Sequence, residues 1–261
     1  MAAQERVEAV CRALPEVEWS ICIRRGDRVI AEVDPDRLLR IASLGKLLVL
    51  MAAAERIQAD PSFADHLLPR PAAPVADSGL WQHLSQGSLS VADACVLTAS
   101  VSDNLATNAL IAGLGLGACN AVARESGCPS FEIHDIVRDI RSADDPPYLA
   151  EGSAQDAVAL LALVDGDSCW SRVRSWLSLG VDHSMALGAL GADPLSPGAV
   201  GEPAHAHKTG SDPGVRADAG LIGPPGAALA YAVIANTDPS SPSVGALSES
   251  MRMVLAAALA D

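Results

Sequence analysis

Three short groups of polar residues contain side chains that can do nucleophilic and acid–base chemistry. Ser43 is followed one helical turn later by Lys46, Ser102-Asp103-Asn104 comes in the middle of the chain, and Lys208-Thr209-Gly210 comes near its end. A serine is a poor nucleophile unless a neighbouring group accepts its proton. Each group alone has an ordinary explanation, as a helix cap or as a lysine before a turn. Their occurrence together in this order predicts a nucleophilic serine with lysine partners.

Lys46 lies in an unusual setting for a lysine, because Leu44 and the apolar residues 47–50 flank it. The pattern from residue 43 to about residue 58 predicts a helix, on which Ser43 and Lys46 share one face. Burial of an unpaired ammonium group is costly, and removal from water lowers the pKa of a lysine. We therefore expect Lys46 to act as a base, and the helix N-terminus to favour negative charge developing at Ser43.

The three groups, taken together, resemble the motifs of the penicillin-recognising serine acyl-transferases, most closely those of the class A β-lactamases. Residues 87–111, "GSLSVADACVLTASVSDNLATNALI", are similar to the family's segment around its S-D-N motif. The spacing from Ser43 to Ser102 and to Lys208 is also similar to that of the family. This resemblance covers nearly the whole chain. It implies a two-lobed β-lactamase-like fold and a serine hydrolase that acts through an acyl-enzyme on Ser43.

The resemblance also implies a role for each catalytic residue. Ser43 is expected to attack an acyl carbonyl, whose oxyanion lies between the backbone N–H groups of Ser43 and Ser211. Ser102 is expected to pass a proton to the leaving group, helped by the positive field of Lys208. The substrate is expected to be a β-lactam or a related small amide or ester.

Substrate binding is assigned to the remaining residues of the same motifs and to two outside them. Asn104 is expected to bind a substrate amide. The substrate is expected to carry a carboxylate, bound by Lys208 with Thr209, Gly210 and Ser211. Arg216 is either a second partner of that carboxylate or a surface arginine paired with Asp212 or Asp218. Trp81 either lies at the entrance of the cleft or is a partly buried packing residue.

The sequence departs from the family where the acyl-enzyme is released. Class A β-lactamases carry an E-x-x-L-N glutamate that activates water, and residues 131–156 contain no such motif. Asp139 is our candidate for this catalytic role, with Glu151 and Glu132 as alternatives, unless these acids only solvate a surface loop. The motifs therefore support formation of the acyl-enzyme, but they do not identify the residue that would release it. An intracellular acyl-transferase and a β-lactam-capturing protein with poor deacylation remain alternatives.

Composition narrows the possible partners. The chain has 261 residues and a formal net charge of −14, which disfavours nucleic acids and anionic membranes as partners. We see no signal peptide and no membrane span, so we expect a cytoplasmic protein with a small-molecule substrate. His205 and His207 lack a third metal ligand at a suitable spacing, so no metal or cofactor is expected. The six cysteines are scattered and are expected to be reduced and mostly buried. Nothing indicates the oligomeric state.

Helical and extended patterns indicate how these residues are positioned. Strands are expected at residues 17–23 and 28–33 and again in three segments after residue 203, so that strands occur at both ends of a chain with a helical middle. This order predicts an α/β (α+β) fold in which one antiparallel sheet is flanked by terminal helices and carries an inserted all-helical lobe. We expect residues 1–40 and 190–261 in the α/β lobe and residues 41–189 in the helical lobe. The active site lies between them in one catalytic unit. Expected helices are 3–14, 43–58, 90–101, 105–112, 153–165, 168–179 and 243–260.

Overall fold

The computed structural model of this chain describes residues 2–73, 75–76, 78–166, 168–195, 202–240 and 244–260. Its α-helices are α1 (Ala3–Arg12), α2 (Lys46–Ala59), α3 (Val91–Ser100), α4 (Asn104–Leu114), α5 (Leu116–Glu125), α6 (Ala154–Asp165), α7 (Ser171–Leu177) and α8 (Val244–Leu259). Its strands are β1 (Glu18–Arg25), β2 (Arg28–Val33), β3 (Leu39–Arg40), β4 (Leu67–Pro69), β5 (Ser88–Ser90), β6 (Glu132–Ile133), β7 (Ala150–Gly152), β8 (His205–Asp212), β9 (Val215–Ile222) and β10 (Leu229–Asn236). The short 3₁₀ helices are η1 (Ala42–Gly45), η2 (Pro61–Asp65), η3 (Trp81–His83) and η4 (Ala186–Leu190).

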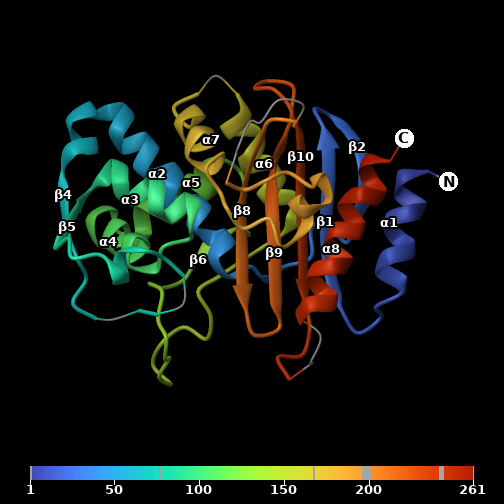
Figure 1. Ribbon diagram of the computed structural model, residues 1–261, viewed down its shortest axis with the longest axis horizontal. Helices are drawn as coiled ribbons and strands as arrows, with labels where there is room; N and C mark the ends of the chain where they lie inside the picture. Colours follow the sequence, from blue (N-terminus) through green and yellow to red (C-terminus); the bar gives the residue numbers. More distant parts are fainter. Residues whose placement is uncertain are drawn as a thin grey trace.

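The main sheet combines strands from both ends of the chain. Its order is β2-β1-β10-β9-β8, and every neighbouring pair is antiparallel. The predicted antiparallel sheet and mixed α/β class are therefore confirmed. Strand β8, which carries Lys208-Thr209-Gly210, is at an edge of this sheet, so one side of its backbone is left without a strand partner. Figure 1 shows this edge facing the helical part of the molecule.

Helices cover both faces of the main sheet. Along β10, Tyr231 and Val233 pack with residues of α1 and α8, which lie side by side on one face (Figure 1). Their neighbours Ala232 and Ile234 point to the opposite face, where α6 contacts the sheet. This division follows from the alternation of side chains along a strand. Because both faces are covered, β10 is buried at every position.

The helical part is built around α2, which continues directly from η1. Nearly every side chain from Lys46 to Ala54 is buried, as expected for a central helix with apolar residues on all sides. Ser90 caps α3 by accepting a hydrogen bond from the Asp93 N–H, and Ser153 caps α6 in the same way. Both caps agree with the helix starts indicated by the sequence.

Helix α5 and two small sheets were not expected from the sequence, and β4 and β5 pair to form the smaller of these sheets. The glycine-rich segment after α4 does not end the helical region, because Gly115 adopts a φ of 85° and α5 begins at the next residue. Strands β3, β7 and β6 form a small separate sheet. Among the described residues, no single helix is both long and apolar enough to cross a membrane. Only α4 and α5 taken as a pair meet the length and composition test, with an 84° bend between them.

Candidate active site

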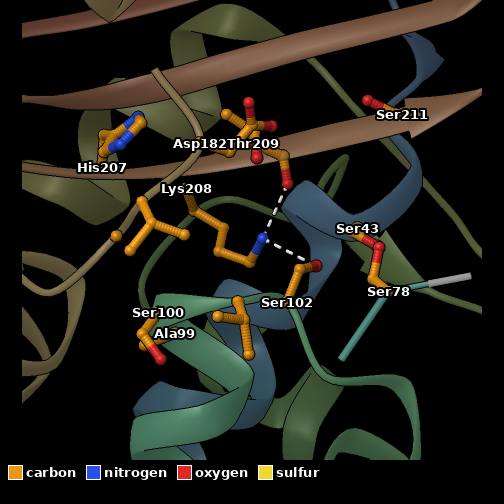
Figure 2. A pocket seen from close by; sticks show the side chains of 13 residues that line it. Ser43, Ser78, Ala99, Ser100, Ser102, Asp182, His207, Lys208, Thr209 and Ser211 are labelled. Carbon is orange, nitrogen blue, oxygen red and sulfur yellow. Dashed lines mark hydrogen bonds between the residues drawn. The ribbon is translucent and has the colours of Figure 1, made fainter. Parts of the chain in front are cut away.

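Two adjoining cavities lie where edge strand β8 faces the helical part of the chain. The first has a volume of about 240 Å³ and the second about 210 Å³. Ser43, Ser78 and Ser211 line both of them. The first is also lined by Ser102, Lys208, Thr209, Asp182 and His207 (Figure 2), and the second by Asn104, Arg138, Asp139 and Arg141. The structure therefore brings residues from all three sequence motifs around Ser43.

Ser43 is held at the first turn of η1, directly before α2. The preceding residue, Ala42, has a backbone φ of 46°, a conformation that residues other than glycine rarely adopt. Strand β8 passes very close to this turn: a Cβ atom on Gly210 would lie 3.1 Å from the Ser43 backbone nitrogen and 2.8 Å from that of Leu44. Only a glycine allows this approach. Gly210 thus has a positioning effect, because it lets the edge of the sheet reach the nucleophile.

Lys46 is fully buried beneath the cavities, and its ammonium nitrogen has three polar neighbours. Nζ lies 2.6 Å from the Ser102 carbonyl oxygen, 2.7 Å from Asn104 Oδ1 and 3.2 Å from Ser102 Oγ. Burial lowers its pKa well below the ordinary value, and the charge of Lys208 lowers it further, although Asp103 acts in the opposite direction. Among the described residues, no hydrogen bond joins Lys46 directly to Ser43. Catalytic hydrogen bonds often tighten only when substrate is bound.

Ser102 is held between two lysines. Its backbone φ is 56°, and its hydroxyl accepts a hydrogen bond of 3.0 Å from Lys208 Nζ (Figure 2). Lys208 also donates to the Thr209 carbonyl oxygen at 2.8 Å. Burial lowers the pKa of Lys208 to about 8, although the carboxylates of Asp182 and Asp218 favour its charged form. At neutral pH Lys208 is therefore mainly protonated, and burial favours the neutral form of Lys46.

The other two residues of the S-D-N motif have different positions. Asp103 is buried and points away from the cavities: its carboxylate accepts hydrogen bonds from the backbone N–H groups of Leu80, Trp81 and Ala106. Asp103 therefore caps α4 and also fixes the backbone of Leu80 and Trp81, where η3 begins. Asn104 lines the second cavity, where its Nδ2 donates to the Ala76 carbonyl oxygen at 2.9 Å.

The loop between β6 and β7 forms a wall of the second cavity. Asp135 bonds to both Arg138 and Arg141 at 2.7 Å, and Asn108 of α4 bonds to both backbone groups of Val137. Asp139 lies in this wall, and both of its carboxylate oxygens accept from the Ala76 N–H, at 3.0 and 2.9 Å. Asp139 therefore shares a cavity with Ser43.

The two alternative acids lie in the small sheet. Glu151 accepts a hydrogen bond from the Tyr148 hydroxyl at 2.6 Å, and Glu132 lies 4.0 Å from His134 Nδ1. Neither lines the two cavities that Ser43 lines. Of the three acids named from the sequence, only Asp139 lines a cavity that Ser43 also lines.

Two residues expected to bind substrate lie elsewhere. Trp81 has no exposed surface and belongs to the hydrophobic core, with its indole N–H donating to the Gln86 carbonyl oxygen. The expectation of a cleft-entrance aromatic is therefore wrong, because η3 turns this side chain inward. Arg216 is half-buried and donates to the carbonyl oxygens of Asp212 and Val215. It is paired in register with Ser211 across β8 and β9, beside the cavities but not among the residues that line them.

Asp182, Ser78 and His207 are among the lining residues that the sequence analysis did not assign to the site. Asp182 and Ser78 come from loops without any recognisable motif. His207 precedes Lys208 on β8 and is buried; its Nδ1 lies 3.1 Å from Asp218, which also accepts from Tyr231. In the sequence, His205 and His207 were considered only as metal ligands, and that role was not expected because a third ligand is lacking. Among the residues that the structure describes, no group of three or more metal-ligating side chains is arranged to hold an ion. The described cysteines are free, and all but Cys169 are buried, as expected.

Comparison with known proteins agrees with this architecture. The sequence model of the β-lactamase enzyme family matches residues 2–252. A β-lactamase from Sphaerobacter thermophilus DSM 20745 has a similar structure, with a TM-score of 0.83 and 25% sequence identity over 98% of this chain and 96% of that chain. A class A β-lactamase from Mycobacterium abscessus is similar at a TM-score of 0.79 and 19% identity, over 97% of this chain and 98% of that one. The structure of PBP-A is similar at a TM-score of 0.79 and 20% sequence identity, over 98% of this chain and 93% of that chain.

None of the curated proteins compared by sequence matches the chain significantly. The family match nevertheless spans almost the whole length, and the solved structures share the arrangement of sheet and helices. With its nucleophile-bearing helix, its two lysines and its edge strand in this arrangement, the chain belongs to the β-lactamase enzyme family and is a serine hydrolase.

Proposed function

We propose that this protein cleaves a β-lactam or a related small amide or ester by forming an acyl-enzyme on Ser43. One observation supports this proposal above all: the Ser102 hydroxyl lies between Lys208 Nζ at 3.0 Å and Lys46 Nζ at 3.2 Å, in the cavity that Ser43 lines. This arrangement provides a path for a proton from the nucleophile to the leaving group. A variant of PBP-A, which has a similar fold, was solved as an acyl-enzyme complex with penicillin G.

Acylation is proposed to proceed in two linked proton transfers. Ser43 Oγ forms a bond to the carbonyl carbon and gives its proton to neutral Lys46. The developing oxyanion is held by the backbone N–H groups of Ser43 and Ser211. As the bond to the leaving nitrogen or oxygen breaks, Ser102 gives its proton to the leaving atom and receives one from Lys46. Protonated Lys208 stabilises the Ser102 oxygen during this exchange, and Asn104 holds the acyl amide.

Release of the acyl group is proposed to use Asp139. A water in the second cavity would attack the ester carbon of acylated Ser43 and give its proton to the Asp139 carboxylate. The bond between the carbonyl carbon and Ser43 Oγ then breaks, Ser43 Oγ receives the proton back from Asp139, and the product acid is freed. The support for Asp139 is its place in the wall of the cavity that Ser43 also lines.

Intact-protein mass spectrometry with a panel of penicillins and cephalosporins tests the proposal, with ring opening followed by absorbance. We expect ring opening in excess over enzyme, and its loss in Ser43→Ala. A lasting one-to-one adduct on Ser43 would instead favour the capturing protein, and the acyl-transferase predicts faster turnover when an amine or alcohol acceptor is added. Turnover that survives Ser43→Ala would show that the nucleophile is wrong.

Three further expectations stay predictions. They are the division into lobes at residues 40/41 and 189/190, the cytoplasmic location, and a carboxylate on the substrate bound by Lys208, Thr209, Ser211 and Arg216. The carboxylate of Asp182, which lines the first cavity, would repel a substrate carboxylate at that position.

A further inference from the structure

Asp182 places a carboxylate at the end of the cleft that is expected to hold the leaving group. It lies in the loop after α7 and lines the first cavity together with Ser43, Lys208 and Thr209 (Figure 2). Since Ser102 and Lys208 deliver a proton to the leaving atom in the proposed mechanism, the part of the substrate beyond that atom faces Asp182. The three sequence motifs contain no acid at this point.

The Asp182 side chain is fixed and ionised. Its Oδ1 accepts hydrogen bonds from the Ser184 backbone N–H at 3.2 Å and from the Ser184 hydroxyl at 2.6 Å. Burial alone would raise the pKa of Asp182, but the hydrogen bonds of Ser184 and Thr209 outweigh burial, and the pKa lies below its usual value. The group is therefore a fixed negative charge at neutral pH, and not a mobile surface acid.

This charge offsets the two cations that would attract a carboxylate. Asp182 favours the charged forms of both Lys208 and Arg216, so its field extends over both side chains. A second carboxylate beside Thr209 would meet like charge at close range in a partly desolvated cleft, where such repulsion is strong. An ionised carboxylate has about four acceptor sites, and Ser184 and Thr209 use only part of them. An uncharged donor on the substrate would find an acceptor there.

We propose that Asp182 determines specificity by selecting substrates whose leaving group presents an uncharged hydrogen-bond donor, such as a carboxamide N–H or a hydroxyl, over substrates that present a carboxylate. This inference rests on the proposed function, because it assumes that Ser43 is acylated in this cleft. It departs from the carboxylate-bearing substrate expected from the sequence, because a substrate of that kind is still accepted but is disfavoured relative to a neutral one.

A matched pair of aryl esters tests the inference. The probes are esters of phenylacetylglycine with 3-hydroxybenzoate, which has an anionic leaving group, and with 3-hydroxybenzamide, which has a neutral one. Release of the phenol gives kcat/KM for each ester. We expect Asp182→Asn to raise the ratio of kcat/KM for the anionic ester to that for the neutral ester by about tenfold or more. Asp182→Ser, which also removes the charge, is expected to change the ratio in the same direction.

Asp144→Asn is the control, because it removes one negative charge from an exposed side chain on the β6–β7 loop outside both cavities. Its ratio should equal that of the unmodified protein. The ratio is taken between two esters measured on the same variant. A partial loss of folded protein lowers both kcat/KM values equally and leaves the ratio unchanged. A ratio that stays the same or falls in both Asp182 variants, while Ser43 is still acylated by the neutral ester, overturns the inference alone. Equal rates in Ser43→Ala and the unmodified protein would overturn the proposed function and, with it, this inference.

Discussion

The hydroxyl oxygen of Ser102 accepts a 3.0 Å hydrogen bond from Lys208 Nζ, while the same oxygen lies 3.2 Å from the nitrogen of a second lysine, Lys46. Burial disfavours the charged form of both lysines. Burial lowers the pKa of Lys208 to about 8 and that of Lys46 well below its ordinary value. Ser102 therefore lies between two buried lysines, and the proton relay that we propose needs Lys46 neutral and Lys208 charged.

Removal of the Ser102 hydroxyl should slow acylation without unfolding the protein. We expect Ser102→Ala to lower kcat/KM by about 10²–10³-fold, because general acid catalysis at the leaving atom is lost. Stopped-flow absorbance with a chromogenic ester or cephalosporin measures this. Ser100→Ala is a matched control: Ser100 lines the same cavity, but its hydroxyl donates only to the Val96 carbonyl oxygen of its own helix. Equal losses in the two variants would argue against the relay.

The pH dependence of acylation should be bell-shaped. Lys46 must be neutral to accept a proton, so kcat/KM should rise with pH through its lowered pKa. Lys208 must keep its proton, so the rate should fall above pH about 8. Lys208→Arg tests the second limb, because a guanidinium stays charged far above this range. We expect the decline near pH 8 to disappear in that variant, although the rate at the optimum is lower. If kcat/KM of Lys208→Arg still falls near pH 8, the decline is caused by a group other than Lys208.

Much of the fold follows from local sequence signals. Strand β10 is apolar along its length, and helices α3 and α6 start at serines followed by an acid three residues on; such signals depend only on neighbouring residues. The Ser43–Lys46 pair could be found for the same reason, since one helix fixes its geometry. The antiparallel sheet then follows from the order of strands at the two ends of the chain.

The residues that the sequence did not predict correctly depend on loops brought together by tertiary packing. Asp182 follows α7 without a motif, and its meeting with Thr209 depends on how the loop and β8 pack. Trp81 follows a proline-rich connection, and its inward direction is set by the hydrogen bond between its backbone N–H and buried Asp103. Helix α5 was missed because glycines usually end helices, whereas Gly115 here serves as the connection between two.

Asp103 should matter for stability more than for chemistry. Asp103→Ala removes the cap of α4 and leaves three backbone N–H groups without their acceptor, of which those of Trp81 and Ala106 are buried. We expect the free energy of unfolding to fall by about 3 kcal/mol, from the usual cost of lost caps and lost buried hydrogen bonds. Urea denaturation measures this. Asp93→Ala removes an exposed acid from the first turn of α3 and should cost less than about 1 kcal/mol. A similar cost for both variants would show that the buried network of Asp103 contributes little.

Asp139 should control release of the acyl group and not its formation. Because Asp139 lies in the wall of the cavity beside Ser43, its carboxylate is placed to accept a proton from an attacking water. In Asp139→Asn the amide cannot do so, and we expect deacylation to slow by about 10²-fold while the acylation rate stays within about twofold. Intact-protein mass spectrometry should then show acylated Ser43 persisting after excess substrate is removed.

Glu151→Gln is the matched control, because that acid bonds to Tyr148 in the small sheet away from the cavities. Deacylation that is unchanged in Asp139→Asn but slowed in Glu151→Gln would reverse the assignment. Unchanged deacylation in both would show that neither acid activates the attacking water.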